Sequence, residues 1–252
     1  MHENQWFPFQ KSVPGSTKYL FCFHHAGGSA SAFRNWTQYA GKINVASVEL
    51  PGKGTRMGEE FIYDFGTLAA EIAEQIDRFS GNGEIYLYGH SMGAALAYCT
   101  GLVLAEKYHR HVEELIVSGR QAPHYPSMDQ YHSSMGDDKL VEELRRLKGT
   151  PEEFLNSREL LKYILPSIKA DYILNESYQY ENEMADFSIK AYCGTEDDDA
   201  CYDIMKHWDE VTTGSFAIEE EPGGHFFPYD MEETFWREIE GEIIEPSVVS
   251  VI

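Results

Sequence analysis

The chain has 252 residues, 42% of them hydrophobic, and a net charge of −22 from 20 Lys and Arg against 42 Asp and Glu. Its length suits one large α/β domain or two small ones, and its negative charge disfavours binding to DNA, RNA or an anionic membrane. The start of the chain lacks the basic and apolar regions of a secretory signal, and no apolar run could span a bilayer, so we expect a cytoplasmic protein.

Short apolar β-runs alternate with amphipathic helices through the first half of the chain. This alternation is typical of the α/β class, in which a mostly parallel sheet is covered by helices on both faces. The spacing of apolar residues predicts strands at 19–24, 45–50, 84–88 and 112–118, and helices at 31–40, 68–79 and 92–108.

The alternation stops near residue 121. Residues 121–182 contain no predicted strand but several helices, one of them at 137–148 with Leu140, Leu144 and Leu147 at helical spacing. Such a segment is too long for a loop, so it predicts a helical lid inserted into a single domain. The pattern then resumes with strands at 188–193 and 216–220 and helices at 201–208 and 231–243, and the β-prone tail 246–252 is not assigned.

The cysteines and histidines show no spacing that is typical of a metal site. No CxxC pair or HExxH motif occurs, so we expect no metal and no redox cofactor. The cysteines are expected to be reduced and without a catalytic role; they are Cys22, Cys99, Cys193 and Cys201.

The motif Gly89-His90-Ser91-Met92-Gly93 has the pattern GxSxG. It lies between a predicted apolar strand and a helix that begins with small residues. This is the context of a nucleophile elbow, in which small neighbours allow the sharp turn that exposes the serine. The motif therefore predicts a serine hydrolase of the α/β-hydrolase fold, with Ser91 as nucleophile.

A serine nucleophile needs a histidine base and an acid, which follow it in the order Ser, acid, His in this fold. His225 comes just after the last predicted strand, behind two glycines. The acid is expected after strand 188–193, within the run from Glu196 to Asp199. We favour Asp197, three residues after the glycine that ends the strand, with Asp198 as the alternative.

An oxyanion on the substrate needs two backbone N–H groups. One is expected from Met92, the residue after the nucleophile. The other is expected from the first strand-to-helix loop, where Ala26 is the candidate and Gly27 the alternative.

Together these segments resemble the type II thioesterases that accompany nonribosomal peptide and polyketide synthases. The GxSxG and GxxD pieces are shared with many hydrolases, whereas the loop after the second strand and the lid segments are more particular. His24-His25 departs from the more usual apolar or proline-containing pair, and the run from Glu196 to Asp199 is unusually acidic. The resemblance covers nearly the whole chain and rests on residues 25–29, Phe33, Trp36, 49–56, 89–94, 118–123, 144–151, 165–171, 176–180, 194–197 and 223–226.

The resemblance implies that the enzyme removes acyl groups from the phosphopantetheine arm of an acyl or peptidyl carrier protein. Carrier proteins are usually acidic, so two negatively charged partners should repel at long range. We therefore expect apolar docking and a local basic spot formed by Lys53, Arg56 and Arg120, although Arg56 could instead anchor its own loop. A monomer is expected.

Three other functions remain open from the sequence. The first is an esterase or lipase that uses the same triad on small acyl esters. The second is the chain-releasing thioesterase domain of a large synthase, against which we note that about eighteen residues precede the first predicted strand. The third is an inactive hydrolase fold that acts as a binding module, which the complete set of triad candidates disfavours.

Overall fold

The structure, a computed structural model, describes residues 4–127 and 130–245. Its centre is a seven-stranded sheet in the order β1-β3-β2-β4-β5-β6-β7. All neighbouring strands are parallel except β1, which pairs antiparallel with β3. The strands are β1 (Phe9–Lys11), β2 (Lys18–Phe23), β3 (Asn44–Ser47), β4 (Glu84–His90), β5 (Val112–Ser118), β6 (Ser188–Gly194) and β7 (Phe216–Glu221).

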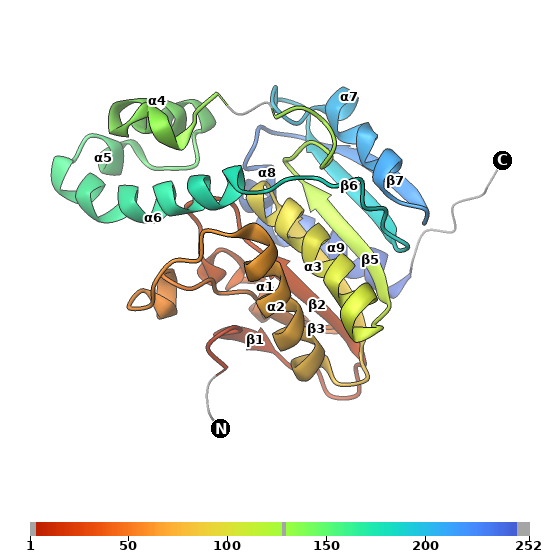
Figure 1. Cartoon of the computed structure of the whole chain (residues 1–252). Coiled ribbons are helices and arrows are strands. Elements are labelled where there is room, and N and C mark those ends of the chain that lie inside the picture. Colours follow the sequence, from red (N-terminus) through yellow and green to blue (C-terminus); the bar gives the residue numbers. More distant parts are fainter. Residues whose placement is uncertain (1–3, 128–129, 246–252) are drawn as a thin grey trace.

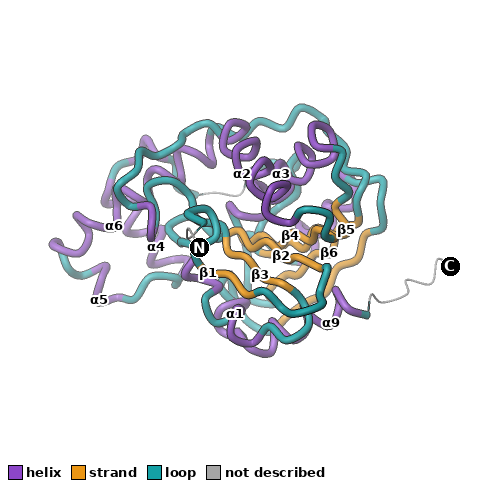
Figure 2. The backbone as a smooth tube through the Cα atoms, turned by 90° about the horizontal axis from the view of Figure 1, so that it is seen from below, coloured by secondary structure: helices purple, strands orange, loops and turns teal. Residues whose placement is uncertain are grey.

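Helices cover both faces of this sheet (Figure 2). On one face α2 and α3 form the larger hydrophobic core with the central strands, and on the other face α1 and α9 form the smaller one. Both faces of the strands are therefore buried, as expected for a parallel sheet. The helices outside the lid are α1 (Trp36–Tyr39), α2 (Phe65–Ser80), α3 (Met92–Tyr108), α7 (Tyr202–Met205), α8 (Phe227–Asp230) and α9 (Glu232–Ile244).

Most predicted elements lie within a few residues of the observed ones, and two predicted helices are broken. Residues 31–40 form a 3₁₀ turn at Ala30–Phe33 followed by the short α1, because Phe33 and Trp36, three apart, can be buried together by either type of helix. The helix predicted at 201–208 is the short α7 followed by 3₁₀ turns at Lys206–Val211.

The strand β1 was not predicted, so the expectation that about eighteen residues precede the first strand is wrong. This strand has only three residues, none of them buried, and they lack an apolar period. Its pairing with β3 joins segments almost forty residues apart, Phe9 with Ser47, which the local sequence does not reveal.

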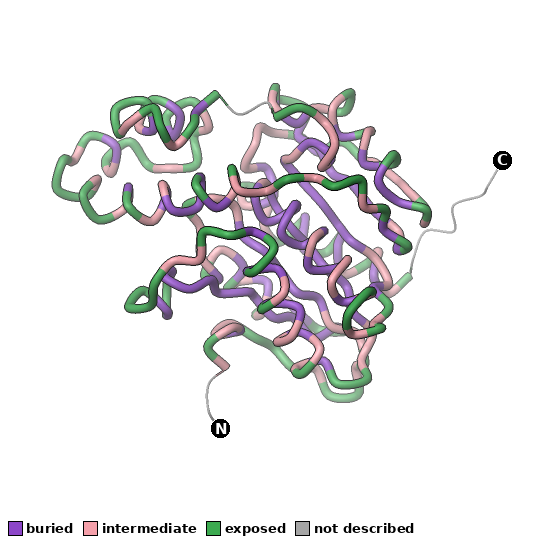
Figure 3. The backbone as a smooth tube through the Cα atoms, in the orientation of Figure 1, coloured by how far each residue is buried: buried purple, intermediate pink, exposed green. Residues whose placement is uncertain are grey.

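Residues 121–182, the lid, contain no strand among the residues described, and they are helical as predicted. The helices α4 (Asp137–Leu147), α5 (Glu152–Leu155) and α6 (Arg158–Glu176) extend beyond the end of the sheet to which the arrow of β5 points (Figure 1). They share a small core of their own and are otherwise mostly exposed or half-buried (Figure 3). That core consists of Tyr131, Leu140, Leu144, Leu155, Leu165, Ile168 and Tyr172.

Within the described ranges, no helix is both long enough and apolar enough to cross a bilayer. The tail 246–252, which the sequence left unassigned, lies outside the described residues.

Candidate active site

Ser91 lies at a sharp turn between β4 and α3. Its backbone has φ 55° and ψ −121°, a conformation that a non-glycine residue rarely adopts. The neighbouring glycines are required by close backbone contacts: a Cβ on Gly89 would lie 2.2 Å from the Gly93 carbonyl oxygen, and one on Gly93 would lie 2.2 Å from the Phe23 carbonyl oxygen. These contacts explain why the motif needs glycine on both sides of the serine.

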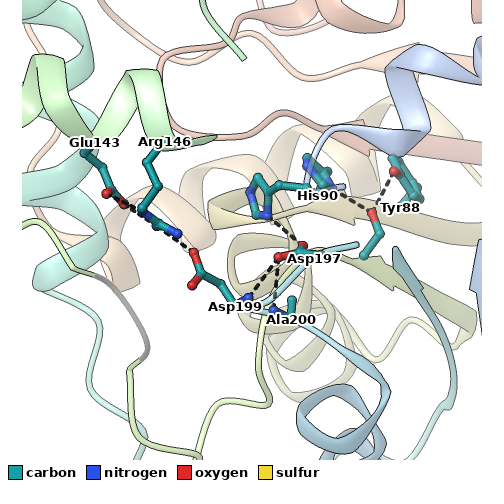
Figure 4. Close-up of polar contacts among 9 residues, drawn as sticks. Tyr88, His90, Glu143, Arg146, Asp197, Asp199 and Ala200 are labelled. Atoms are coloured by element: carbon teal, nitrogen blue, oxygen red, sulfur yellow. Dashed lines mark hydrogen bonds and ion pairs between the residues drawn. The ribbon is translucent and has the colours of Figure 1, made fainter. Parts of the chain in front are cut away.

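His225 and Asp197, the base and acid expected from the sequence, lie next to each other beyond the ends of β6 and β7. His225 Nδ1 lies 2.9 Å from Asp197 Oδ2, and both side chains are largely buried. Asp197 Oδ1 accepts hydrogen bonds from the backbone amides of Asp199 and Ala200, at 3.0 and 3.2 Å (Figure 4). Burial alone would raise the pKa of Asp197, but the hydrogen bond and charge of His225 and the two amides hold it below its usual value.

The alternative acid, Asp198, is exposed, and only Asp197 of the two bonds to His225. The geometry therefore favours Asp197 as the group that orients the imidazole. Ser91 and His225 line the same cavity without a hydrogen bond between them in the described part of the chain. Hydrogen bonds of this kind often tighten only when substrate binds.

The candidate amides for an oxyanion differ in their existing hydrogen bonds. The Met92 N–H belongs to the first turn of α3, where a helix offers no internal acceptor. Ala26 and Met92 line one cavity together with Ser91 and His225. Among the described residues, no group accepts from the Ala26 N–H, whereas the Gly27 N–H donates to Asp171 Oδ2 at 2.6 Å. The geometry therefore favours Ala26 over Gly27.

Two further histidines surround His225. The His25 ring is 4.9 Å from the Phe226 ring and His90 is 5.0 Å from the His225 ring, measured between centroids. Burial holds the pKa values of His25 and His90 well below the usual histidine value, and the charge of His225 adds to this effect. Both rings therefore stay neutral when His225 takes up a proton.

Hydrogen bonds fix the orientation of these neutral rings. His25 Nδ1 bonds to the Tyr229 hydroxyl at 2.8 Å. Ser118 Oγ forms two hydrogen bonds, one with His90 Nδ1 and one with the Tyr88 hydroxyl, each 2.8 Å long (Figure 4).

Two adjoining cavities lie below the lid, and the inner one reaches Ser91. The inner one has about 100 Å³ and lies between Ser91, His225, Leu144 and Tyr172. The outer one has about 620 Å³ and is lined mostly by apolar groups of the lid and of the loops after β2 and β3. Four residues line both cavities: Gly27, Gly149, Thr150 and Ile168. The shared wall residues place the outer cavity directly beside the inner one.

The expectation that Lys53 and Arg56 form an exposed basic spot is wrong, because both are buried, with 3% and 7% of their surface exposed. Lys53 Nζ lies 2.5 Å from Asp171 Oδ2 on α6, so its charge is already paired inside the protein. Arg56 lies over the Trp6 ring, 3.9 Å from its centroid, and pairs with Glu59. It anchors its own loop, the alternative that the sequence left open.

Arg120 is half-buried and lines a cavity together with Ser91. Its Nη1 donates to Asn175 Oδ1 of α6 at 2.7 Å. It therefore lies at the junction of the lid and the body, and it remains a predicted contact for a carrier protein.

The sequence did not reveal the role of two charged lid residues that connect the lid to the site. Asp171 of α6 holds the Gly27 amide, and Arg146 of α4 pairs with Asp199 at 2.6 Å (Figure 4). Asp171 belongs to one of the segments that carry the family resemblance, but the sequence around it does not indicate which residues it contacts. Its contacts with Gly27 and Lys53 join residues more than a hundred positions apart.

Among the residues described, one group has the composition of a metal site. His124, His207 and Glu210 place their ligand atoms within 4.8 Å of one another. Both imidazoles bond to the Glu210 carboxylate, at 2.9 and 2.6 Å, so hydrogen bonds alone account for this arrangement.

Comparison with known proteins identifies relatives along most of the chain. The family model described as "Thioesterase domain" matches residues 18–243. The gramicidin S biosynthesis protein GrsT of Aneurinibacillus migulanus is 34% identical over 229 residues, which cover 90% of this chain and 89% of that protein.

Solved structures agree with the sequence matches. The type II thioesterase BorB from the borrelidin biosynthetic cluster superposes with a TM-score of 0.84 at 30% identity, covering 96% of this chain and 99% of that one. YbtT, a type II thioesterase from the yersiniabactin NRPS/PKS biosynthetic pathway, superposes with a TM-score of 0.81 at 30% identity, covering 90% and 92%. With the sheet order and the elbow, these likenesses confirm the α/β-hydrolase fold.

Proposed function

Because the chain belongs to the thioesterase family and is a type II thioesterase of nonribosomal peptide and polyketide synthase pathways, we propose that it hydrolyses acyl groups from phosphopantetheine arms. The arm would be carried by an acyl or peptidyl carrier protein, and the enzyme would act as a monomer in the cytoplasm. The reaction would use Ser91, His225 and Asp197 and needs no cofactor.

The observation that carries this proposal is the convergence at Ser91. A strained serine, a histidine paired with a buried aspartate, and an unbonded Ala26 amide line adjoining cavities beneath the lid. These are the groups that acyl transfer to a serine requires.

In the first step His225 accepts the Ser91 proton while Oγ forms a bond to the thioester carbonyl carbon. The Ala26 and Met92 amides hold the resulting oxyanion. When the tetrahedral intermediate collapses, the carbon–sulfur bond breaks, and the thiolate leaves with the proton from His225. Asp197 keeps the imidazole oriented and stabilises its charged form, since its own pKa is held low.

In the second step His225 accepts a proton from water, whose oxygen attacks the acyl-enzyme. The same amides hold the second oxyanion. Collapse breaks the ester bond and returns the proton to Ser91, which releases the carboxylic acid. The neutral His25 and His90 place no competing positive charge beside His225 during either step.

The two cavities suggest how the substrate lies. We place the acyl group in the inner cavity of about 100 Å³ and the extended arm in the outer cavity of about 620 Å³. Met57 and Tyr163 line the outer cavity and are 75% and 80% exposed. Such exposed apolar side chains suit docking between two acidic proteins, whose charges repel each other at long range.

The direct test is hydrolysis of a panel of acyl-loaded carrier proteins, with Ser91→Ala as the inactive control. Turnover of loaded carriers by the wild type and not by Ser91→Ala would support the proposal. Faster turnover of oxyesters than of thioesters of the same acyl group would favour the alternative esterase. Failure of a fluorophosphonate to label the wild type would favour an inactive fold.

The docking site is tested by comparing two variants. Met57→Glu with Tyr163→Glu should raise KM for a loaded carrier and leave hydrolysis of a small acyl thioester unchanged if the carrier docks at the outer cavity. Arg120→Glu should do so if the carrier docks at the junction of lid and body. Equal effects on both substrates would show that these residues support the active-site loops.

A further inference from the structure

One carboxylate of the lid bonds to two separate loops of the hydrolase body. Asp171 Oδ2 accepts from the Gly27 amide at 2.6 Å and from Lys53 Nζ at 2.5 Å. Lys53 also donates to Ser167 Oγ, one turn earlier on α6, at 2.8 Å. Asp171 and Lys53 are each only 3% exposed, so both charges are held away from water.

Stability alone does not account for this pair. Taking two charges out of water costs about as much as their attraction returns, and well-packed apolar residues often serve as well. The position of the pair is therefore informative, because the pair joins α6 to the loop whose Ala26 lines the cavity at Ser91.

The bond to Gly27 selects one conformation of that loop. The Gly28 N–H donates to the His25 carbonyl at 3.0 Å, which closes a four-residue turn with Ala26 and Gly27 in its centre. Gly27 has φ +85°, the value for the third position of a type II turn. Type I and type II turns differ by a flip of the central peptide, and the Gly27 N–H of that peptide points at Asp171.

A turn with glycine at this position can flip its central peptide at little cost. A donor in an oxyanion hole must be fixed before the reaction, because reorientation during the reaction reduces the stabilisation that it gives to the transition state. The Ala26 N–H lies on the preceding His25–Ala26 peptide, so Asp171 constrains it through the turn, whose Gly27 N–H it holds. Ile168 adds a packing contact, since a Cβ on Gly27 would lie 3.2 Å from its Cγ1.

We propose that Asp171 is a positioning residue: by holding the Gly27 N–H when the lid is closed, it fixes the turn that carries the Ala26 N–H on the adjoining His25–Ala26 peptide and so completes the oxyanion hole, an inference that rests on the proposed serine mechanism. Lys53 balances the buried carboxylate and holds it at the turn. Because Asp171 belongs to the lid, opening of α6 removes the constraint. The oxyanion hole is then complete only over an enclosed substrate.

The test compares two double variants in which both Lys53 and Asp171 lose their charge. Only one of the two keeps an acceptor for the Gly27 N–H. Lys53→Met with Asp171→Asn keeps an amide oxygen for the Gly27 N–H, whereas Lys53→Met with Asp171→Leu has nearly the same shape and no acceptor. Neither pair leaves a buried charge without a partner, and thermal unfolding would establish that both are folded. If the Lys53→Met background folds poorly, Lys53→Gln replaces it with the same two changes at Asp171.

We expect the Asp171→Asn pair to keep kcat for a small acyl thioester within about threefold of the wild type. The Asp171→Leu pair should lose about 10- to 100-fold in kcat with little change in KM, since loss of a whole oxyanion donor costs about 10²- to 10³-fold. The rate of fluorophosphonate labelling at Ser91 should fall in parallel, because the phosphoryl oxygen occupies the same hole.

Equal kcat values and equal labelling rates for the two pairs would overturn the positioning role. A loss confined to KM would also overturn it, since it would assign Asp171 to substrate binding. If the wild type is labelled but hydrolyses no thioester, the proposed substrate class is wrong, and the labelling rates still decide the role of Asp171. Absence of labelling in the wild type would overturn both.

Discussion

The guanidinium of Arg146 on α4 lies 2.6 Å from the carboxylate of Asp199, in the loop that carries Asp197 (Figure 4). The amide of Asp199 in turn donates to Asp197 Oδ1. One ion pair therefore connects a lid helix to the loop that orients His225. Arg146 also pairs with Glu143, whose side chain is 6% exposed.

Loss of this ion pair should favour the open lid. Arg146→Gln should raise hydrogen exchange in α4 and lower kcat/KM about two- to fivefold, as expected for a partly exposed pair of about 0.2–1 kcal/mol. Arg145→Gln is the matched control, because Arg145 pairs with Glu152 inside the lid. Equal effects of the two changes would show that the pair with Asp199 does not hold the lid.

The two neighbouring acids should differ sharply in their importance for turnover. Asp197→Asn should lower kcat about 10²- to 10⁴-fold, because the imidazole loses its orienting carboxylate. Asp198→Asn, at an exposed position, should change kcat less than about twofold. Steady-state kinetics on a small thioester measures both, and a crippled Asp198→Asn variant would contradict the assignment.

The elbow should not tolerate a methyl group at Gly93. A Cβ there would lie 2.2 Å from the Phe23 carbonyl oxygen, which is backbone and cannot move aside. Gly93→Ala should therefore lower the free energy of unfolding by about 1–3 kcal/mol or more. Gly241→Ala on the exposed side of α9, where the added Cβ meets nothing within 4 Å, should raise it by about 0.5–1 kcal/mol. Denaturant unfolding compares the two, and equal effects would contradict the steric argument.

Glu114 on β5 should make the protein less stable as the pH rises. Burial raises its pKa to about 7, and the nearby Glu242 adds to the rise. The unfolded chain releases this proton near pH 4.5, so the folded state binds more protons between pH 4.5 and 7 and loses stability across that range.

Glu114→Gln should remove this effect. The free energy of unfolding at pH 8 should rise by about 1–3 kcal/mol, and at pH 4.5 it should match the wild type closely. Glu113→Gln, at a neighbouring glutamate whose side chain is 36% exposed, is the control. A Glu114→Gln variant with the same stability difference at both pH values would show that Glu114 has no raised pKa.

The lid should open on the microsecond to millisecond timescale and gate access to Ser91. Its helices share only a small core, and much of their surface is exposed. Hydrogen exchange should therefore be faster in α4 and α5 than in β4 and β5. Uniformly high protection across residues 137–182 would contradict a mobile lid.

Some elements of this protein are determined by the local sequence. The helix α3 and the strand β5 have the bounds that their apolar patterns predict, because both lie in the buried centre of the domain. The elbow around Ser91 was equally predictable, since its glycines are required by backbone contacts that any chain with this turn must make.

Other features were decided only by the tertiary structure. Which of four successive acids bonds to His225 depends on the path of one turn, and the Gly27 N–H is occupied by Asp171, which is 144 positions from Gly27. Lys53 appeared in the sequence as a free cation and is a buried partner of the lid. Charges and hydrogen-bond donors find partners by proximity in space, and a single sequence specifies that proximity only through the packing of the whole chain.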